Sequence, residues 1–223
     1  MEHKKKELTR YHLMAPIRAR SVGVQLSPEE SAIWKKIAAL RFQASRYSCQ
    51  QALHTLGLTQ SWDALCERGY LTNLFQERHE SLRVITYDFL STLKVYTMGR
   101  HVSSIEFCLR NEEYSLSIDE FNNIFHFAQT KVGIIEEPDE YDWDEFWRAI
   151  TLPRESERFF PARTKVNDIR NPVLRYMAKA MAYLLFARFE VGSVQTDDLF
   201  FIWCMLRGQR VNMSHYIIKY LER

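Results

Sequence analysis

The sequence predicts a mainly α-helical fold, a single helical domain of about seven or eight helices with one small β-hairpin. Two features of the composition favour this class, since only 7 of the 223 residues are glycine and 13% are aromatic. Few glycines and many large apolar side chains are typical of a well-packed helical core. The order of elements agrees, because neither a strand–helix–strand alternation nor a repeat of about 30–45 residues is visible along the chain.

Capping residues mark the starts of the predicted helices. Ser27 precedes Pro28 and is followed by Glu30, which combines an N-cap serine, proline at the first helical position and a capping-box glutamate. Ser117 and Glu120 repeat the capping box. The stretches with helical signals, from which seven or eight helices are expected, are residues 27–41, 49–56, 62–68, 81–93, 117–125, 143–150, 172–189, 196–208 and 212–221.

The later helices also have start and stop signals. Asn171 with Pro172 opens the strongest helix, Thr196 with two following aspartates opens the next, and Asn212 caps the last. The residues expected to end helices are Gly57, Gly69, Pro153, Gly192 and Gly208.

The hydrophobic period changes between residues 105 and 117. Ile105, Phe107 and Leu109 alternate with less apolar residues, a polar turn follows at 110–112, and Tyr114 and Leu116 alternate again. A period of two on both sides of a turn predicts a short β-hairpin.

Apolar side chains at helical spacing indicate which faces point inward. The predicted inward residues are Tyr87, Leu90 and Leu93 on one helix, Phe121, Ile124 and Phe125 on another, and Tyr176, Met177, Met181, Tyr183 and Leu184 on a third. For the third set, a surface for a partner protein is the alternative to core. His126, between two phenylalanines, is expected to be a core or boundary residue.

Charge is distributed unevenly along the chain. Residues 1–46 carry a net +6, residues 47–160 a net −9 and residues 161–223 a net +5. We expect residues 1–26 to form a basic, flexible arm and residues 27–223 to form the helical domain. The basic ends and the acidic middle either attract one another within the fold or present separate surfaces.

Two groups of cations are candidates for phosphate contacts. The candidate nucleic-acid-binding residues are Lys4, Lys5, Lys6, Arg10, Arg18 and Arg20 in the arm, and Arg175 and Lys179 near the C-terminus. Arg163, Lys165 and Arg170 extend the second group. A solvated, charged terminus is the plainer interpretation of the arm, and Arg175 could instead pair with an acid of the middle segment.

Known catalytic and cofactor motifs are absent from the sequence. The glycines are too far apart for a phosphate-binding loop, no CxxC pair suits zinc or redox chemistry, and no HxH or HxxxH pair suits a metal. Seven acids in residues 136–145 lack the spacing of a calcium loop, so we interpret them as a solvated loop. The sequence therefore predicts no catalytic residue, no metal and no cofactor. The four cysteines lie in apolar surroundings and are expected to be small buried residues in a reducing compartment.

The N-terminus has no apolar segment typical of a signal peptide. The longest charge-free apolar run is residues 180–187, far shorter than the roughly 20 residues that span a bilayer. We therefore expect an intracellular protein, cytoplasmic or nuclear, with no transmembrane segment.

The order of several short motifs over residues 45–222 resembles a known family. These motifs are residues 87–93 (YDFLSTL), 107–114 (FCLRNEEY), 116–121 (LSIDEF), 125–127 (FHF), 146–151 (FWRAIT), 171–176 (NPVLRY) and 186–188 (FAR). Together they resemble the plant retrotransposon-derived domain of Athila-type elements, the C-terminal domain of their first open reading frame. They are more distantly similar to the plant mobile domain.

The resemblance implies a gag-like or accessory protein of a plant Gypsy-class element, with no catalytic residues to carry over. We therefore expect a non-enzymatic domain that acts by protein interaction or self-association, with no small-molecule substrate and no membrane partner. The alternative is a nucleic-acid-binding module that uses the basic arm and the C-terminal cations. An enzyme with a scattered active site is the third hypothesis.

Overall fold

The computed structural model describes residues 26–40, 48–76, 82–127, 136–151, 158–161, 163–188 and 190–222. Within these ranges the chain forms ten α-helices, one short 3-10 helix and one three-stranded antiparallel sheet. The prediction of a mainly α fold is confirmed, whereas the expected seven or eight helices and single hairpin are wrong in number. The basic arm predicted over residues 1–26 lies outside the described residues, except for residue 26.

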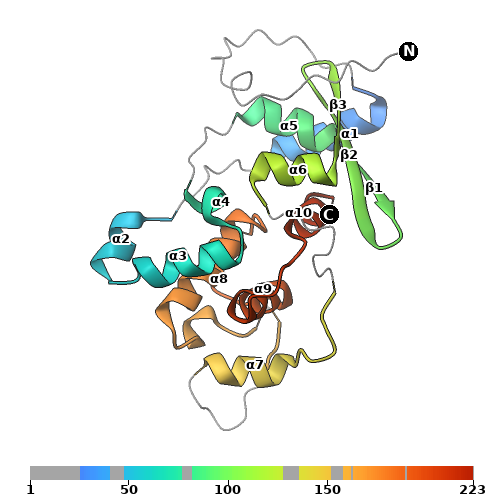
Figure 1. Ribbon diagram of the computed structural model, residues 1–223. Helices are drawn as coiled ribbons and strands as arrows, with labels where there is room; N and C mark the ends of the chain where they lie inside the picture. The colour runs from blue at the N-terminus through green and yellow to red at the C-terminus, as the bar shows by residue number, and fades with distance from the viewer. Residues whose placement is uncertain are drawn as a thin grey trace.

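Figure 1 shows the elements in two groups, which we call the sheet half and the helical half. The sheet half contains α1 (Pro28–Ala39), α5 (Arg83–Thr92), β1 (Lys94–Met98), β2 (His101–Leu109), β3 (Glu112–Ser117) and α6 (Ile118–Phe125). The helical half contains α2 (Gln50–Thr55), α3 (Thr59–Arg68), α4 (Thr72–Gln76), α7 (Trp143–Ile150), η1 (Val166–Asp168), α8 (Pro172–Leu184) and α9 (Thr196–Arg207). α10 (Met213–Leu221) lies between them and contacts α6 and β2. One continuous hydrophobic cluster extends through both halves.

The sheet has the order β1-β2-β3, and both strand pairs are antiparallel. Its second loop places Arg110 and Asn111 at φ +52° and +63°, which is the pattern of a type I′ hairpin turn. The predicted hairpin is therefore present as β2 and β3, but β2 begins at His101, before the expected Ile105. The sequence analysis does not predict the strand β1, and four of its five residues are exposed in the structure.

α5 packs on β2, and α1 packs on α5. The Trp34 ring of α1 meets the Tyr87 ring edge to face, with 5.6 Å between the ring centroids. Asp88 is 3% exposed and accepts hydrogen bonds from the Trp34 side chain and from the backbone N–H of Arg110. Burial nevertheless raises the pKa of the Asp88 carboxyl above its usual value. Asp88 therefore joins α1 and the β2–β3 turn to α5.

The buried face of α5 is more polar than predicted. Leu90 and Leu93 are half-buried, whereas Asp88, Ser91 and Thr92 are buried. The Thr92 hydroxyl donates to the Asp88 carbonyl oxygen at 2.6 Å and accepts a hydrogen bond from a backbone N–H of β2 at 2.8 Å. These polar groups lie inside because they hold the helix to the sheet through hydrogen bonds.

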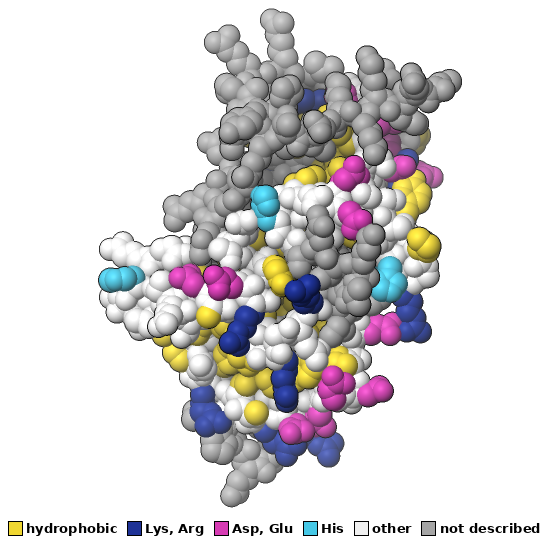
Figure 2. Space-filling view, viewed as in Figure 1, with side chains coloured by type: hydrophobic (Ala, Val, Ile, Leu, Met, Phe, Trp, Pro, Cys, Tyr) yellow, Lys and Arg dark blue, Asp and Glu magenta, His cyan; other side chains and the backbone are white. Residues whose placement is uncertain are grey.

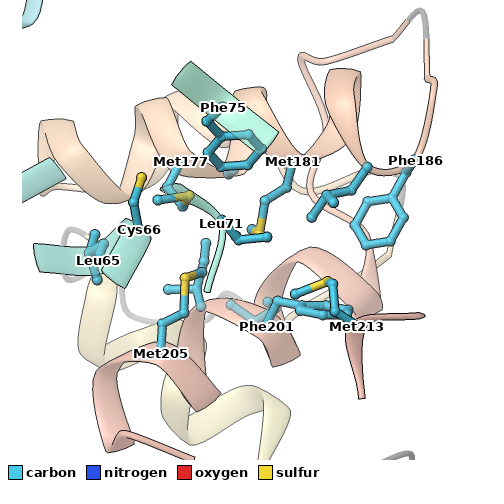
Figure 3. Close-up of a cluster of buried hydrophobic side chains, with 14 of the residues drawn as sticks. Leu65, Cys66, Leu71, Phe75, Met177, Met181, Phe186, Phe201, Met205 and Met213 are labelled. Atoms are coloured by element: carbon cyan, nitrogen blue, oxygen red, sulfur yellow. The ribbon is translucent and has the colours of Figure 1, made fainter. Parts of the chain in front are cut away.

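The helical half contains the densest part of the core. Figure 3 shows the side chains of Met177 and Met181 on α8 facing those of Phe201 and Met205 on α9, with Leu71 between the two helices. All five side chains are at most 3% exposed. The core interpretation of the α8 stripe is thus confirmed for Met177 and Met181.

Several helix ends follow the predicted signals. The capping boxes at Ser27 and Ser117 are both formed, Asn212 caps α10, and Gly208 ends α9 with φ +68°. α8 ends earlier than predicted, at Leu184, where the chain turns back so that backbone N–H groups 186 and 188 bond to α8 carbonyls. No described helix is long and apolar enough to cross a lipid bilayer.

The inward face predicted for α6 is only partly correct. Phe121 is buried, but Ile124 and Phe125 are 42% and 38% exposed. His126 is exposed, not a core or boundary residue, because it ends α6 in the left-handed conformation with φ +55°. That turn directs the following Phe127 into the core, where it is 5% exposed.

Candidate interaction surfaces

The predicted nucleic-acid-binding cations fall into two groups in the structure. Lys4, Lys5, Lys6, Arg10, Arg18 and Arg20 lie outside the described residues. Arg175 and Lys179 lie one turn apart on α8, and both are half-buried. The Arg175 guanidinium donates to the carbonyl oxygen of Ile169 from Nε at 3.1 Å and from Nη2 at 2.8 Å. Arg175 therefore fastens the turn that precedes α8 instead of pairing with the acidic middle segment.

Two adjacent phenylalanines before α8 have opposite environments. Phe159 is 8% exposed and stacks on Trp143, with 5.9 Å between the ring centroids and 8° between the ring planes. Its backbone N–H donates to Asp144 Oδ1 at 2.7 Å. Phe160, by contrast, is 55% exposed.

Phe160 is held by a closed turn. Its carbonyl oxygen accepts hydrogen bonds from the backbone N–H groups of Arg163 at 3.1 Å and Thr164 at 3.0 Å. The Thr164 hydroxyl donates to the same oxygen at 2.8 Å and accepts the N–H of Phe160 at 2.9 Å. The N–H of Val194 in turn donates to the Thr164 carbonyl oxygen at 2.9 Å. The exposed ring is thus carried by a turn that is tied to the chain before α9.

Exposed cations surround this turn. Arg158, Arg163 and Lys165 are all exposed. Arg170 is exposed as well, and its guanidinium donates to the Ala149 carbonyl oxygen at 3.3 Å, which links it to the end of α7. On the face shown in Figure 2, Lys and Arg side chains are spread over the lower, helical half, and Asp and Glu side chains lie both at its lower right and at its left.

The acidic run at residues 136–145 is mostly exposed, as the loop interpretation predicts, but several of its residues have structural contacts. Glu136 forms an ion pair with Arg100, with 2.5 Å between Oε1 and Nη1. Asp142 Oδ1 accepts the N–H of Glu145 at 2.7 Å and so caps α7. Tyr141 is 8% exposed and anchors the segment in a second apolar cluster beside α9.

No group of three His, Cys, Asp or Glu side chains within the described ranges is placed to hold a metal ion.

The sheet half exposes several large apolar side chains on α1, α5 and β1. α1 has no buried residue, and its Leu40 cap is 67% exposed. Val84 on α5 is 63% exposed, and Tyr96 and Met98 on β1 are 44% and 75% exposed. Figure 2 shows hydrophobic side chains along the right-hand rim, where Figure 1 places β1. Exposed large apolar side chains such as these are candidates for contact with another molecule.

A buried polar junction joins α10 to the sheet half. The Ser214 hydroxyl donates to Asn122 Oδ1 of α6. His215 Nδ1 accepts the backbone N–H of Val102 on β2 at 3.2 Å. Burial is the largest cause that lowers the pKa of His215, with smaller contributions from Lys219 and His101. A neutral imidazole is required here, because Nδ1 can accept only when it carries no proton.

A buried ion pair closes the connection between α8 and α9. Arg188 Nη2 pairs with Asp198 Oδ1, and the Asp198 side chain is 1% exposed. Asp198 Oδ2 also accepts the N–H of Gln195 at 2.9 Å and so caps α9. Burial raises the pKa of Asp198, although both partners oppose this shift.

The four cysteines are free and differ in exposure. Burial raises the pKa of the Cys66 and Cys204 thiols to about 12. Cys108 on β2 is half-buried, and Cys49 is exposed at the start of α2. The prediction of buried cysteines is therefore correct for two positions and wrong for Cys49.

The sequence analysis missed both Phe160 and the exposed strand β1. The signal for Phe160 is the order of residues 158–165 (RFFPARTK), in which two aromatic residues lie among cations and a proline. The sequence does not show which of the two rings is buried, because that depends on contacts with α7. For β1, the signal is the Met98-Gly99-Arg100 turn between two stretches rich in β-branched and aromatic residues.

Comparison with known proteins gives one match. The model of the ATHILA ORF-1 family matches residues 24–209. This match includes α1, which the motif resemblance over residues 45–222 left out, and it ends before α10. No curated protein and no solved structure matches the chain.

Proposed function

Because the chain belongs to the ATHILA ORF-1 family, we propose that this retrotransposon-derived domain acts without catalysis, as a gag-like or accessory protein whose copies associate through the sheet half. The exposed apolar side chains of β1 carry the proposal. Tyr96 and Met98 are 44% and 75% exposed. Burying such side chains between two copies contributes about 25 cal/mol for each Å² of apolar surface removed from water.

The charges on the two edges of the sheet favour a second copy as the partner. β1 begins at Lys94, whereas β3 begins with Glu112 and Glu113. All three residues are exposed. A β1 edge of one copy is therefore attracted to the β3 edge of another, while two β3 edges repel each other.

The contact uses side chains more than a continued sheet. The β1–β2 register shifts between Tyr96 and Thr97, and a bulge with a nearby lysine discourages the addition of another strand. Tyr96 and Met98 then provide the apolar area, and the edge charges orient the copies.

The test is the mass of the purified full chain as a function of concentration, measured by sedimentation velocity. The double variant Tyr96→Ser/Met98→Ser should weaken association by about tenfold or more, equal to about 1.4 kcal/mol. Leu56→Ser is the matched control, since Leu56, the C-cap of α2 in the helical half, is 68% exposed. A wild-type chain that stays monomeric up to about 100 µM, a concentration at which even weak pairs form, contradicts the proposal. An equal loss with Leu56→Ser contradicts the assignment to the sheet half.

The alternative function is nucleic-acid binding through the basic arm and the C-terminal cations. The exposed Arg163 and Lys165 support it, while the contacts of Arg175 leave that guanidinium less available. The test is fluorescence anisotropy with a ~30-nucleotide RNA and a matched duplex DNA at about 50 and 200 mM salt. Binding that falls at least about tenfold between these salt concentrations, and that is lost when residues 1–20 are removed, supports the arm. Absence of binding to both ligands contradicts this alternative.

A further inference from the structure

The Phe160 turn presents an aromatic ring to solvent in a fixed position. Full burial of a phenylalanine side chain contributes about 1.5–3 kcal/mol to folding stability. Phe160 contributes less than this because it is 55% exposed. The ring is not placed there by a loose loop, since four hydrogen bonds close residues 160–164 into one turn. The neighbouring Phe159 already fills the apolar site beside Trp143.

The charges next to this ring are positive. Arg163 follows Phe160 by three residues, and its backbone N–H donates to the Phe160 carbonyl oxygen at 3.1 Å, so both residues belong to the same turn. Arg158 precedes the ring, Lys165 follows it, and both are exposed. The described residues from 158 to 170 contain four cations and a single acid, Asp168. The ligand that fits this surface therefore combines a flat apolar face with negative charge.

We propose that the turn at residues 158–165 binds single-stranded nucleic acid, with a base stacked on Phe160 and the adjoining phosphates against Arg158, Arg163 and Lys165. Unpaired bases offer a free π face, and stacking on an aromatic side chain is worth about 1–3 kcal/mol per base. Bases within a duplex are already stacked on their neighbours, so a single exposed ring has no access to them. An acidic peptide matches the charges but leaves the Phe160 ring without a stacking partner.

This site is independent of self-association through the sheet half, because it lies next to α7 and α8. It rests on the nucleic-acid alternative given above, but it assigns the binding to residues other than the arm. The experiment must therefore separate the turn from residues 1–20.

The experiment measures fluorescence anisotropy of a labelled 20-nucleotide oligo(U) with the full chain at about 50 mM salt. Phe160→Ala should weaken binding by about tenfold, within the range expected for one stacked base, whereas Phe160→Trp should retain it. Leu56→Ala is the control, since it removes an apolar side chain that is 68% exposed at the C-cap of α2. Phe160→Ala should leave the unfolding midpoint unchanged, because the ring is not part of the core.

The contribution of the cations to binding is measured separately, from the salt dependence of the affinity. Arg163→Gln/Lys165→Gln should reduce the slope of log affinity against log salt by about 1.4, or about 0.7 for each phosphate that is no longer neutralised. The control is Lys35→Gln/Lys36→Gln, which removes two exposed cations from α1 and should leave the slope unchanged.

Three outcomes would overturn the proposal. The first is no binding of oligo(U) to the wild-type chain. The second is binding by Phe160→Ala as tight as the wild type, including the case in which only removal of residues 1–20 abolishes it. The third is an equal loss of affinity for a duplex of the same length, which would show that the ring does not distinguish unpaired bases.

Discussion

α1 and α9 are both helices of twelve residues, yet their environments are opposite. Residues 198–205 of α9 are buried without interruption, whereas no residue of α1 is buried. α9 packs against α3, α7 and α8, while α1 packs chiefly on α5. α9 is therefore held mainly by buried apolar contacts, whereas α1 leaves apolar side chains such as Ile33 exposed.

The two halves also differ in how their elements are joined. In the helical half, apolar side chains such as Met177 and Phe201 are buried completely or almost completely. In the sheet half, Asp88 and Thr92 hold α5 to its neighbours by hydrogen bonds. Apolar packing tolerates few changes in volume, whereas a polar contact depends on the presence of both partners. Three substitutions, taken from the largest expected effect to the smallest, test this difference.

Phe201→Ala should cause the largest loss, about 3–5 kcal/mol of unfolding free energy. Phe201 is 1% exposed and lies between Phe186 and Tyr216, with ring centroids 5.6 and 4.9 Å away. The measurement is denaturant unfolding followed by circular dichroism. Met98→Ala, at a side chain 75% exposed on β1, should change stability by less than about 0.5 kcal/mol. Similar losses for the two variants would show that the halves do not differ as described.

Asp88→Ala should lower the unfolding free energy by about 1–3 kcal/mol, because it removes the buried carboxyl group that accepts from the Trp34 side chain and from the backbone N–H of Arg110. Asp88→Asn should cost less, since its side-chain oxygen still accepts while the charge is absent. The raised pKa of Asp88 means that the folded state binds its proton more tightly than the unfolded state. Stability therefore falls as pH rises from about 3.9, the unfolded value, through the folded pKa.

Asp88→Asn should remove this fall, as seen by comparing unfolding free energies across that pH range. A loss from Asp88→Ala no larger than that from Asp88→Asn would show that the hydrogen bonds to Trp34 and Arg110 contribute little.

The His215 junction should give the smallest effect, a decline in stability on mild acidification. Its folded pKa lies below the unfolded value, so stability is full above about pH 6.5 and falls as pH drops towards the folded pKa. The measurement is the unfolding free energy between about pH 7.5 and 5.5, a range that contains the unfolded pKa. His215→Gln should abolish the slope, and the exposed His54→Gln should retain it. An unchanged slope in His215→Gln would assign the pH dependence to other groups.

Local signals predict the parts of this fold that depend on neighbouring residues in the sequence. The capping boxes of Ser27 and Ser117 need only residues up to three positions away, and both are formed. The stop at Gly208 needs only a residue that accepts positive φ. Features that depend on distant contacts are not predicted by such signals.

Gly69 illustrates this limit. The sequence predicts a helix stop at Gly69, and α3 does end there, but the φ of Gly69 is negative and the left-handed position belongs to Tyr70 at φ +54°. A Cβ atom at Gly69 would lie 2.8 Å from Met205 Sδ of α9. Glycine therefore suits this position because another helix approaches it closely, which no local pattern indicates.

The candidate surfaces also combine features that local sequence predicts with features that depend on distant contacts. The sequence identifies Arg163 and Arg175 as candidate phosphate-binding cations. Only the fold shows that the Arg175 guanidinium donates to a backbone carbonyl oxygen, whereas Arg163 is exposed. Likewise, the sequence contains Phe159 and Phe160 side by side, and contacts with α7 decide which ring is buried.

The four free thiols report on the opening of the two halves. Cys66 and Cys204 lie in the helical half with pKa values raised to about 12, Cys108 lies on β2, and Cys49 is exposed. Because thiolate and access together control alkylation, a thiol reagent should modify Cys49 before the others. Cys66 and Cys204 should react only when the helical core opens, so the order of alkylation records which half opens first. The native sequence thus contains its own probes of local unfolding, with no engineered label required.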